Sequence, residues 1–329
     1  MKVKCFVHTD LDGIGCTILA YLAFGKENVD VEYCNYTDVN KKVSDHICNL
    51  GWQNYDKTYI TDISITDDLA IIINETNELY NVKLFDHHPT ALMLNEYDWC
   101  TVQVSLPEAP DRKTCGTELF CKYLFENDKI ITSYEYFYHD VERFVNYVRD
   151  WDTWRWKELG EGGLVSKKLN DMFDIYGREK FIDWTIKRIY YPPYPTAVFP
   201  CFDETDELLL ELRQKEIDDY VKRQNLQMDS LNDKFGYVFG VVFADRYISE
   251  LGNKLCELNP DLDYVAIINM VAGTVSYRTT RDELDLGGTI AHSYGGGGHA
   301  KAAGSTFSRD LALKDLSELI FSSDPFNEW

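Results

Sequence analysis

An acidic residue followed by two histidines, Asp86, His87 and His88, stands between the apolar run 82–85 and Pro89. Such a cluster packs poorly in an apolar core. Imidazole and carboxylate groups together suit a divalent transition ion such as manganese, zinc or iron. Because three adjacent residues cannot complete a metal site, the sequence predicts that further ligands come from other parts of the chain.

A second set of polar residues follows the apolar run 3–7, and its members are His8, Asp10 and Asp12. In an extended chain, residues two positions apart point to the same face, so this spacing predicts a row of three ligands. Gly13 and Gly15 are expected to let the backbone turn sharply into a helix over 16–24, whose N-terminus favours anions. The alternative is an ordinary strand-to-helix turn capped by an aspartate.

The first part of the chain alternates between short apolar runs and helical patterns. Strands are predicted over 3–7, 29–34, 58–62 and 82–85, and helices over 16–24, 42–50 and 69–78. This alternation predicts an α/β domain with a doubly wound, mainly parallel sheet. Sites in such sheets lie beyond the carboxyl ends of the strands. The side chains expected to converge there are His8, Asp10, Asp12, Asp62, Asp86 and His87. Taken alone, Asp62 is equally well explained as a cap or turn residue.

Two further helices are predicted over 115–125 and 138–150, and three tryptophans follow, at positions 151, 154 and 156. One acid, Asp152, stands among them. The aromatic residues are consistent with a packed corner, and equally with a wall that screens a ligating Asp152 from water. The spacing leaves both interpretations open.

A proline-rich break divides the chain, with Pro192, Pro193 and Pro195 in an extended connector. The charged segment 204–232 has apolar residues at helical spacing, which predicts a long linker helix lying across both domains. A coiled-coil dimer arm is the alternative, so a homodimer is left open. The predicted domains are 1–190, a connector and linker helix over 191–232, and a smaller α/β domain over 233–329.

In the second domain a strand is predicted over 237–243, a helix over 249–258 and a hairpin over 263–271 and 273–277, with Arg278 just past it. The glycine-rich run 295–304, which includes Gly297, Gly298 and His299, exposes successive backbone N–H groups that can cradle a phosphate. We expect it to lead into a helix rich in small residues. The alternative is a flexible loop.

The composition limits the partners. The 329 residues carry a net charge of −22, which argues against a surface for long duplex nucleic acid, held through its phosphates by Lys and Arg. Short anionic substrates remain compatible. Nine cysteines without a Cys-x-x-Cys pair, no secretory signal and no long apolar span predict a cytoplasmic protein that does not bind a membrane.

Six motifs occur in a fixed order, and they are His8-Thr9-Asp10-Leu11-Asp12-Gly13-Ile14-Gly15, Thr61-Asp62, Asp86-His87-His88, Trp151-Asp152-Thr153-Trp154, Ser276-Tyr277-Arg278-Thr279 and the run 295–304. With these motifs the chain resembles, over most of its length, the DHH phosphoesterase superfamily with a C-terminal DHH-associated domain. The residues of the first motif and of the Asp152-Thr153-Trp154 segment are most similar to those of the bacterial nanoRNase/oligoribonuclease branch. Many DHH sequences place the first His four residues before the first Asp, whereas the spacing here is two.

The resemblance implies two Mn²⁺ ions, with Mg²⁺ or another divalent ion as the alternative. One ion would be held by His8, Asp10 and Asp62, and the other by Asp12, Asp62, His87 and Asp152. Asp150 competes with Asp152 for the last position. Asp86 would orient His87, and His88 would contact the scissile phosphate. The residues expected to bind substrate are Ser276, Arg278, Gly297, Gly298 and His299.

The resemblance further implies a metal-dependent phosphodiesterase that hydrolyses very short RNA oligonucleotides to mononucleotides. The alternative activity is hydrolysis of nucleotide signals, namely cyclic dinucleotides, their linear products or 3′-phosphoadenosine phosphate. A non-catalytic nucleotide-sensing module is the alternative from a different class. Since every matched ligand position is intact, the sequence favours an enzyme.

Overall fold

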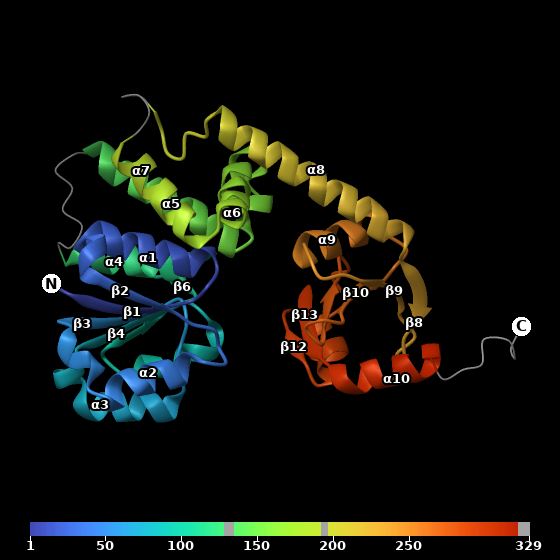
Figure 1. Cartoon of the computed structure of the whole chain (residues 1–329), viewed down its shortest axis with the longest axis horizontal. Coiled ribbons are helices and arrows are strands. Elements are labelled where there is room, and N and C mark those ends of the chain that lie inside the picture. The colour runs from blue at the N-terminus through green and yellow to red at the C-terminus, as the bar shows by residue number, and fades with distance from the viewer. Residues whose placement is uncertain (128–134, 192–196, 322–329) are drawn as a thin grey trace, which may run out of the picture. The chain divides into compact units, whose positions relative to one another are not determined.

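The computed structural model describes residues 1–127, 135–191 and 197–321 and contains two compact units, Met1–Leu210 and Glu211–Trp329 (Figure 1). The three prolines of the predicted connector lie outside the described residues, and the predicted division at 190 and 232 stays a prediction. None of the helices in the described ranges combines the length and the apolar character that a membrane span requires.

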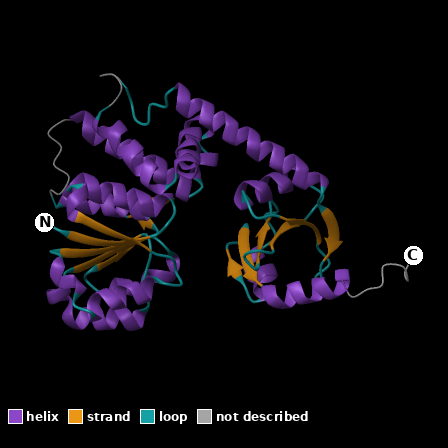
Figure 2. Cartoon of the chain, in the orientation of Figure 1, coloured by secondary structure: helices purple, strands orange, loops and turns teal. Residues whose placement is uncertain are grey.

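A five-stranded parallel sheet forms the centre of the first unit (Figure 2). Its strands in chain order are β1 (Val3–Val7), β2 (Val29–Tyr33), β3 (Lys57–Thr61), β4 (Val82–Asp86) and β5 (Cys100–Val102). Their spatial order is β2-β1-β3-β4-β5, and every neighbouring pair is parallel. The predicted doubly wound parallel sheet is therefore confirmed.

Helices cover both faces of this sheet, as Figure 1 shows. On one face lie α1 (Leu11–Phe24) and α4 (Gly116–Glu126), and on the other lie α2 (Val39–Cys48) and α3 (Asp67–Tyr80). Both faces are buried in separate apolar clusters. This explains why β1 is buried at all five positions and reads as an almost continuous apolar run.

Further helices and short elements complete the first unit. An outer layer packs against α1 and α4 and consists of α5 (Glu135–Asp152), α6 (Leu164–Tyr176) and α7 (Arg178–Tyr190). A small hairpin joins β5 to α4 and contains β6 (Ser105–Leu106) and β7 (Ala109–Lys113). Short 3₁₀ segments occur at η1 (Lys26–Asn28), η2 (Gly51–Asn54), η3 (Pro89–Glu96), η4 (Arg155–Lys157) and η5 (Gly160–Gly163).

The strand order reverses between β1 and β3, because the chain runs outward from β1 to β2 and then returns to the other side of β1. In open parallel sheets the crevice for ligands lies at such a switch point, beyond the carboxyl ends of the strands. His8 follows β1 directly and Asp62 follows β3 directly. The topology thus places two predicted ligands on the two sides of the switch point.

The first helix begins earlier than predicted, at Leu11, so the expected extended row of His8, Asp10 and Asp12 is wrong. Asp10 caps the helix, since its Oδ1 accepts a hydrogen bond from the Gly13 N–H at 3.1 Å. Gly13 lies inside α1 and does not form a turn before it. A Cβ there would overlap the backbone of His8. Close packing therefore explains this glycine.

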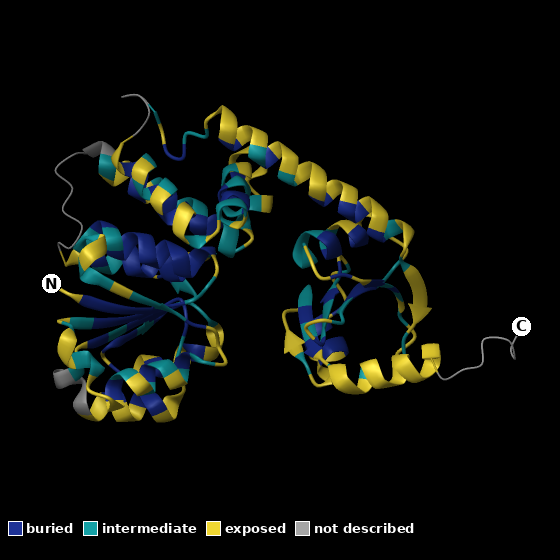
Figure 3. Cartoon of the chain, in the orientation of Figure 1, coloured by how far each residue is buried: buried dark blue, intermediate teal, exposed yellow. Residues whose placement is uncertain are grey.

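A mixed six-stranded sheet forms the second unit, in the order β12-β13-β11-β10-β9-β8. Its strands are β8 (Asp229–Asn232), β9 (Val238–Phe243), β10 (Tyr264–Asn269), β11 (Thr274–Arg278), β12 (Gly297–Gly298) and β13 (Ala302–Thr306). The helix α8 (Glu204–Leu226) begins in the first unit and continues into the second. The other elements of the second unit are α9 (Ile248–Leu258), η6 (Leu286–Ala291), η7 (His292–Tyr294) and α10 (Arg309–Phe321). Apolar clusters bury both faces of the sheet, whereas no residue of α10 is buried (Figure 3). The predicted smaller α/β domain is confirmed as a fold.

Three expectations for the second half of the chain are wrong. The helix predicted to reach position 232 ends at Leu226, because residues 229–232 pair with β9 as an edge strand. The glycine-rich run leads into a hairpin of β12 and β13, and no helix follows it directly. Arg278 is the last residue of β11 and does not lie beyond the strand.

Candidate metal centre

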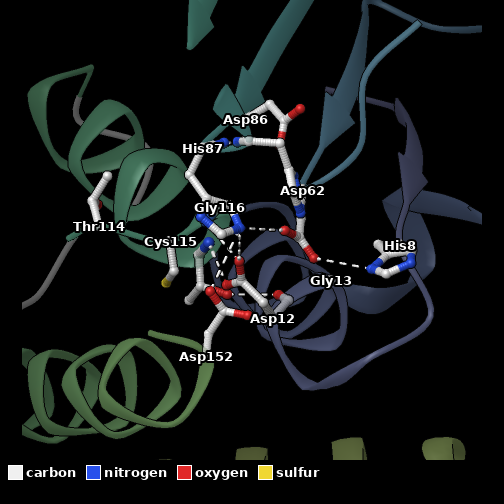
Figure 4. Close-up of polar contacts among 12 residues, drawn as sticks. His8, Asp12, Gly13, Asp62, Asp86, His87, Thr114, Cys115, Gly116 and Asp152 are labelled. Atoms are coloured by element: carbon white, nitrogen blue, oxygen red, sulfur yellow. Dashed lines mark hydrogen bonds and ion pairs between the residues drawn. The ribbon is translucent and has the colours of Figure 1, made fainter. Parts of the chain in front are cut away.

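Imidazole and carboxylate groups from four separate segments meet beyond the carboxyl ends of β1, β3 and β4 (Figure 4). In one group, ligand atoms of His8, Asp10 and Asp62 lie within 4.8 Å of one another. Asp12, His87 and Asp152 form a second group by the same measure, and Asp62, Asp86, His87 and His88 form a third. The structure therefore brings all six predicted metal ligands together.

Asp62 lies between the two imidazoles. Its Oδ2 is 3.6 Å from Nδ1 of His8, and its Oδ1 is 3.4 Å from Nε2 of His87. The residue has a left-handed backbone with φ of 57°, which is uncommon for a non-glycine residue and clusters at functional sites. The Asp62 N–H donates to the Phe85 carbonyl at 2.8 Å, which ties this conformation to β4. With one oxygen turned to each imidazole, Asp62 has the arrangement of a bridging carboxylate.

Asp12 is buried against the N-terminus of α4. Its Oδ2 accepts a hydrogen bond from the Gly116 N–H at 2.6 Å, and its Oδ1 accepts one from the Thr117 N–H at 2.8 Å. The free N–H groups of a helix N-terminus stabilise a carboxylate. In addition, the Thr117 hydroxyl donates to the Asp12 carbonyl at 2.6 Å. The first turn of α4 thus fixes the Asp12 carboxylate, whose Oδ2 lies 3.7 Å from Nε2 of His87.

Gly116 is a positioning residue that sequence reasoning missed. A Cβ at this position would lie 2.7 Å from the Cβ and 2.9 Å from the Cα of Asp62. Real Cβ atoms do not approach other atoms so closely, so α4 can contact Asp12 and Asp62 only with glycine here. One sign was available in the sequence, a glycine at the predicted start of a helix, but nothing there indicated which residues it approaches.

Asp152 is the last residue of α5, and its Oδ2 lies 3.5 Å from Nε2 of His87. Its competitor Asp150 is turned elsewhere, because its carboxylate pairs with Arg149 at 2.9 Å and with Arg155 at 3.4 Å. The rings of Trp151, Trp154 and Trp156 pack on one another, and Asp152 joins the cluster, so the role of the aromatic segment as a corner or as a screening wall stays a prediction.

Asp86 orients the imidazole of His88 and not, as expected, that of His87. Its Oδ1 lies 2.7 Å from Nδ1 of His88, whereas from His87 it accepts only the backbone N–H, at 2.8 Å. The Ser64 hydroxyl donates to the other oxygen of Asp86. Burial opposes a charged His88, but the hydrogen bond with Asp86 and the Asp86 charge together raise the pKa of His88 above its ordinary value. This pairing favours the protonated imidazole, which donates from both nitrogens.

Crowding of acids dominates the electrostatics of the cluster. Burial, followed by the charges of Asp12 and Asp10, raises the pKa of Asp62 well above its ordinary value. The same causes in the same order raise the pKa of Asp152. Across the described ranges, no lysine or arginine forms an ion pair with these four acids. The cluster therefore concentrates negative charge that a bound cation would neutralise.

Three buried polar atoms of the cluster make no well-oriented hydrogen bond within the described part of the chain, and they are Nδ1 of His8, Oδ2 of Asp62 and Nε2 of His87. Of these, Nδ1 of His8 lies 2.9 Å from Oδ2 of Asp10, but at an angle that is unsuitable for a hydrogen bond. Buried groups of this kind normally have partners. All three face the interior of the cluster, where carboxylate oxygens lie close by. Because imidazole nitrogens and carboxylate oxygens are ligands for divalent transition ions, these residues fit a divalent cation.

The predicted substrate-binding residues lie on or next to two strands at one edge of the sheet in the second unit. Ser276 and Arg278 belong to β11, Gly297 and Gly298 belong to β12, and β13 lies between these strands. The guanidinium of Arg278 donates to Ser249 Oγ at 3.1 Å, and its Nε is buried without a hydrogen-bond partner in the described residues. His299 follows β12 directly and is exposed. The sheet thus brings these residues into one region of the second unit, and their role stays a prediction.

Comparison with known sequences finds relatives of this chain. Oligoribonuclease NrnB of Bacillus subtilis (strain 168) is 36% identical to the chain over 322 residues, which cover 97% of this chain and 76% of NrnB. An uncharacterized protein of Acanthamoeba polyphaga mimivirus is 25% identical over 246 residues, which cover 73% of this chain and 50% of that protein. No family model matches the chain.

Solved structures show the same fold at low identity. The DHH domain of a member of a ribosomal-protein family matches with a TM-score of 0.59 and 12% identity, over 96% of this chain and 85% of that one. RecJ from Thermus thermophilus, solved with Mn²⁺, matches with a TM-score of 0.54 and 13% identity, over 97% of this chain and 51% of RecJ. These structures confirm the α/β architecture that the sequence predicted.

The close approach of Gly116 to Asp62 leads to a prediction. Gly116→Ala should displace Asp62 or separate α4 from Asp12, and so lower the affinity for Mn²⁺ by about 10–100-fold, the range seen when the groups that orient metal ligands are lost. Isothermal titration of the metal-free protein with Mn²⁺ measures this. Gly162→Ala is the matched control, because a Cβ there meets nothing within 4 Å. Equal Mn²⁺ affinity in both variants would show that Gly116 does not position the cluster.

Proposed function

Because the chain belongs to the DHH phosphoesterase superfamily, in the nanoRNase branch, we propose that it hydrolyses very short RNA oligonucleotides to mononucleotides. It is a metal-dependent phosphoesterase. The proposed substrate follows the name of its relative NrnB, an oligoribonuclease that matches nearly the whole chain. The reaction is hydrolysis of a phosphodiester bond. It releases one nucleotide and leaves a strand that is one nucleotide shorter, until only mononucleotides remain.

The arrangement of Asp62 carries this proposal. One oxygen of its carboxylate faces His8 and the other faces His87, so that two groups of ligands share one acid. The first group is completed by Asp10, whose Oδ2 lies 2.9 Å from Nδ1 of His8. The second is completed by Asp12 and Asp152. Two adjacent ligand groups with a shared carboxylate are the protein's contribution to two-metal phosphoryl chemistry.

We assign one Mn²⁺ ion to His8, Asp10 and Asp62, and a second to Asp12, Asp62, His87 and Asp152. When bound, a pair of divalent cations supplies a water nucleophile at neutral pH and offsets the charge that develops on the phosphate oxygens. The α4 N-terminus holds Asp12, and β4 holds Asp62 through its backbone N–H. These contacts fix the ligands before any substrate arrives.

In this proposal His88 acts on the scissile phosphate. Its Nδ1 is paired with Asp86, so a protonated ring presents an Nε2–H donor on its other side. This donor would bond to a non-bridging phosphate oxygen or give its proton to the leaving 3′ oxygen. The hydrogen bond from Ser64 keeps the Asp86 carboxylate in place while His88 donates to the phosphate.

We assign the second unit to substrate binding. Ser276, Arg278, the backbone of Gly297 and Gly298, and His299 would hold a neighbouring phosphate or the terminal nucleotide. Arg278 carries a charge that burial makes costly, since burial lowers the pKa of its guanidinium. Its Nε has no partner in the described residues, so a phosphate oxygen would supply one.

The choice of substrate is tested with labelled RNAs of increasing length, starting with the dinucleotide, incubated with purified protein and Mn²⁺. We expect the shortest RNAs to be cleaved fastest and to yield mononucleotides, because the net charge of −22 disfavours long polyanions. A cyclic dinucleotide and 3′-phosphoadenosine phosphate are assayed in parallel. Rapid cleavage of either of these beside inert short RNAs would refute the proposed substrate.

The bridging role of Asp62 predicts that Asp62→Ala lowers the Mn²⁺-dependent turnover by about 10³-fold or more, because both ligand groups lose a member. Steady-state hydrolysis of the dinucleotide measures the loss. Asp68→Ala, which removes an exposed acid from the first turn of α3, is the control and should keep nearly full activity. Wild-type turnover by Asp62→Ala would contradict the assignment of the metal ligands.

The assignment of the second unit predicts that Arg278→Ala raises KM by about tenfold or more, since a charge-assisted hydrogen bond to phosphate is lost. Mn²⁺ affinity, measured by isothermal titration, should stay at the wild-type value. Arg309→Ala, on the exposed helix α10, serves as the control for loss of a positive charge. A variant that loses Mn²⁺ affinity but keeps KM would contradict the proposed division of roles.

A further inference from the structure

Tyr36 lies beside the metal centre, on the loop between β2 and α2, and has no role in the mechanism above. Its neighbours fix this loop to the end of β1. The Cys34 N–H donates to the Val7 carbonyl at 2.8 Å, and the Thr9 hydroxyl donates to Oδ1 of Asn35 at 3.3 Å. The Asn35 N–H donates to Asp38 at 2.8 Å, which closes the turn before α2. The backbone on both sides of Tyr36 is therefore held in place.

The ring of Tyr36 reaches imidazoles from two different strand ends. Its centroid lies 5.1 Å from that of His8 and 5.9 Å from that of His88, to which it is nearly perpendicular. Although it touches these two residues, the side chain is 57% exposed. Tyr36 thus lies on the solvent side of the centre, where a substrate must enter.

The hydroxyl of Tyr36 completes a chain of hydrogen bonds through His88. It lies 3.1 Å from Nε2 of His88, while Nδ1 of the same ring lies 2.7 Å from Asp86. Ser64 in turn donates to Asp86. This series of hydrogen bonds therefore runs from a half-buried serine to an exposed tyrosine, and both ring nitrogens of His88 are occupied. A ring held at both nitrogens has one orientation, with Nε2 turned toward Tyr36 and Nδ1 toward Asp86.

We propose that Tyr36 is a positioning residue that acts through His88. Its hydroxyl holds Nε2 of His88 in the direction of the incoming phosphate and releases this nitrogen to a phosphate oxygen when substrate binds. The exchange replaces one hydrogen bond by another, so it needs no further reactant. It rests on the proposed function, because it assumes that His88 meets the phosphate of a substrate.

The experiment compares Tyr36→Phe with the wild-type protein, alone and combined with His88→Ala. Removing the hydroxyl should lower kcat by about tenfold, the loss expected for one orienting hydrogen bond, and leave KM within about twofold. In the His88→Ala background it should cause no further loss, since the group through which it acts is gone. Tyr191→Phe, at a tyrosine that is 76% exposed, is the control and should match the wild type.

Two outcomes would overturn the proposal. An equal fractional loss of kcat in both backgrounds would show that Tyr36 acts independently of His88. A rise in KM with unchanged kcat would show that Tyr36 only binds substrate. The same comparison is made with bis(p-nitrophenyl) phosphate, a general phosphodiester. If the wild type cleaves this probe but not short RNA, the proposed substrate is refuted. The kcat values of the variants with the probe then still decide whether Tyr36 acts through His88.

A second readout does not depend on activity. Long-range ¹H–¹⁵N spectra of the metal-free protein report the hydrogen bonds of each imidazole. The His88 nitrogen resonances should shift in Tyr36→Phe, whereas those of His46, whose Nε2 pairs with Thr58, should not. Unchanged His88 resonances would show that the hydroxyl does not hold this ring in solution.

Discussion

The rest of the centre depends on one contact, in which the buried carboxylate of Asp12 in α1 accepts hydrogen bonds from the first turn of α4. Two N–H groups of the helix hold both of its oxygens. This contact requires that α4 come within van der Waals distance of Asp62, which only a glycine at position 116 permits. Since Asp12 and Asp62 both face His87, the helix that stabilises one acid also sets the distance between the two ligand groups.

The sheet and the outer helices supply the remaining constraints. The reversal of strand order at β1 and β3 places His8 and Asp62 on adjacent strand ends, and α5 brings Asp152 to the same place from outside the sheet. Asp150 is kept away by its pairs with Arg149 and Arg155. Arg149 also pairs with Glu118 of α4 at 2.8 Å, so the helix that holds Asp12 and the helix that carries Asp152 are joined directly.

Hydrophobic periodicity predicted the parallel sheet and the convergence of His8, Asp10, Asp12, Asp62 and His87, because it locates strand ends and parallel strands end at one edge. Asp152 ends a helix, so strand ends could not indicate it, and only the family resemblance pointed to it. Contacts that depend on tertiary packing were not predictable. Gly116 meets Asp12 across 104 positions. Asp86 pairs with the ring of His88 and not with that of His87, a choice made by side-chain rotation. Asp10 both caps α1 and faces His8, so two interpretations that the spacing presented as alternatives are compatible.

Charge connects this centre to the kind of substrate it can accept. The chain has 55 acidic and 33 basic side chains, so its overall field repels a polyanion. The cluster adds four carboxylates that form no ion pair with lysine or arginine in the described residues, and only bound cations would reverse the local sign. Under the proposed function, a phosphate is then attracted at the centre and at a few groups such as Arg278. Each added nucleotide brings another charge into the repelling field, so under the proposed function affinity should fall as the strand grows.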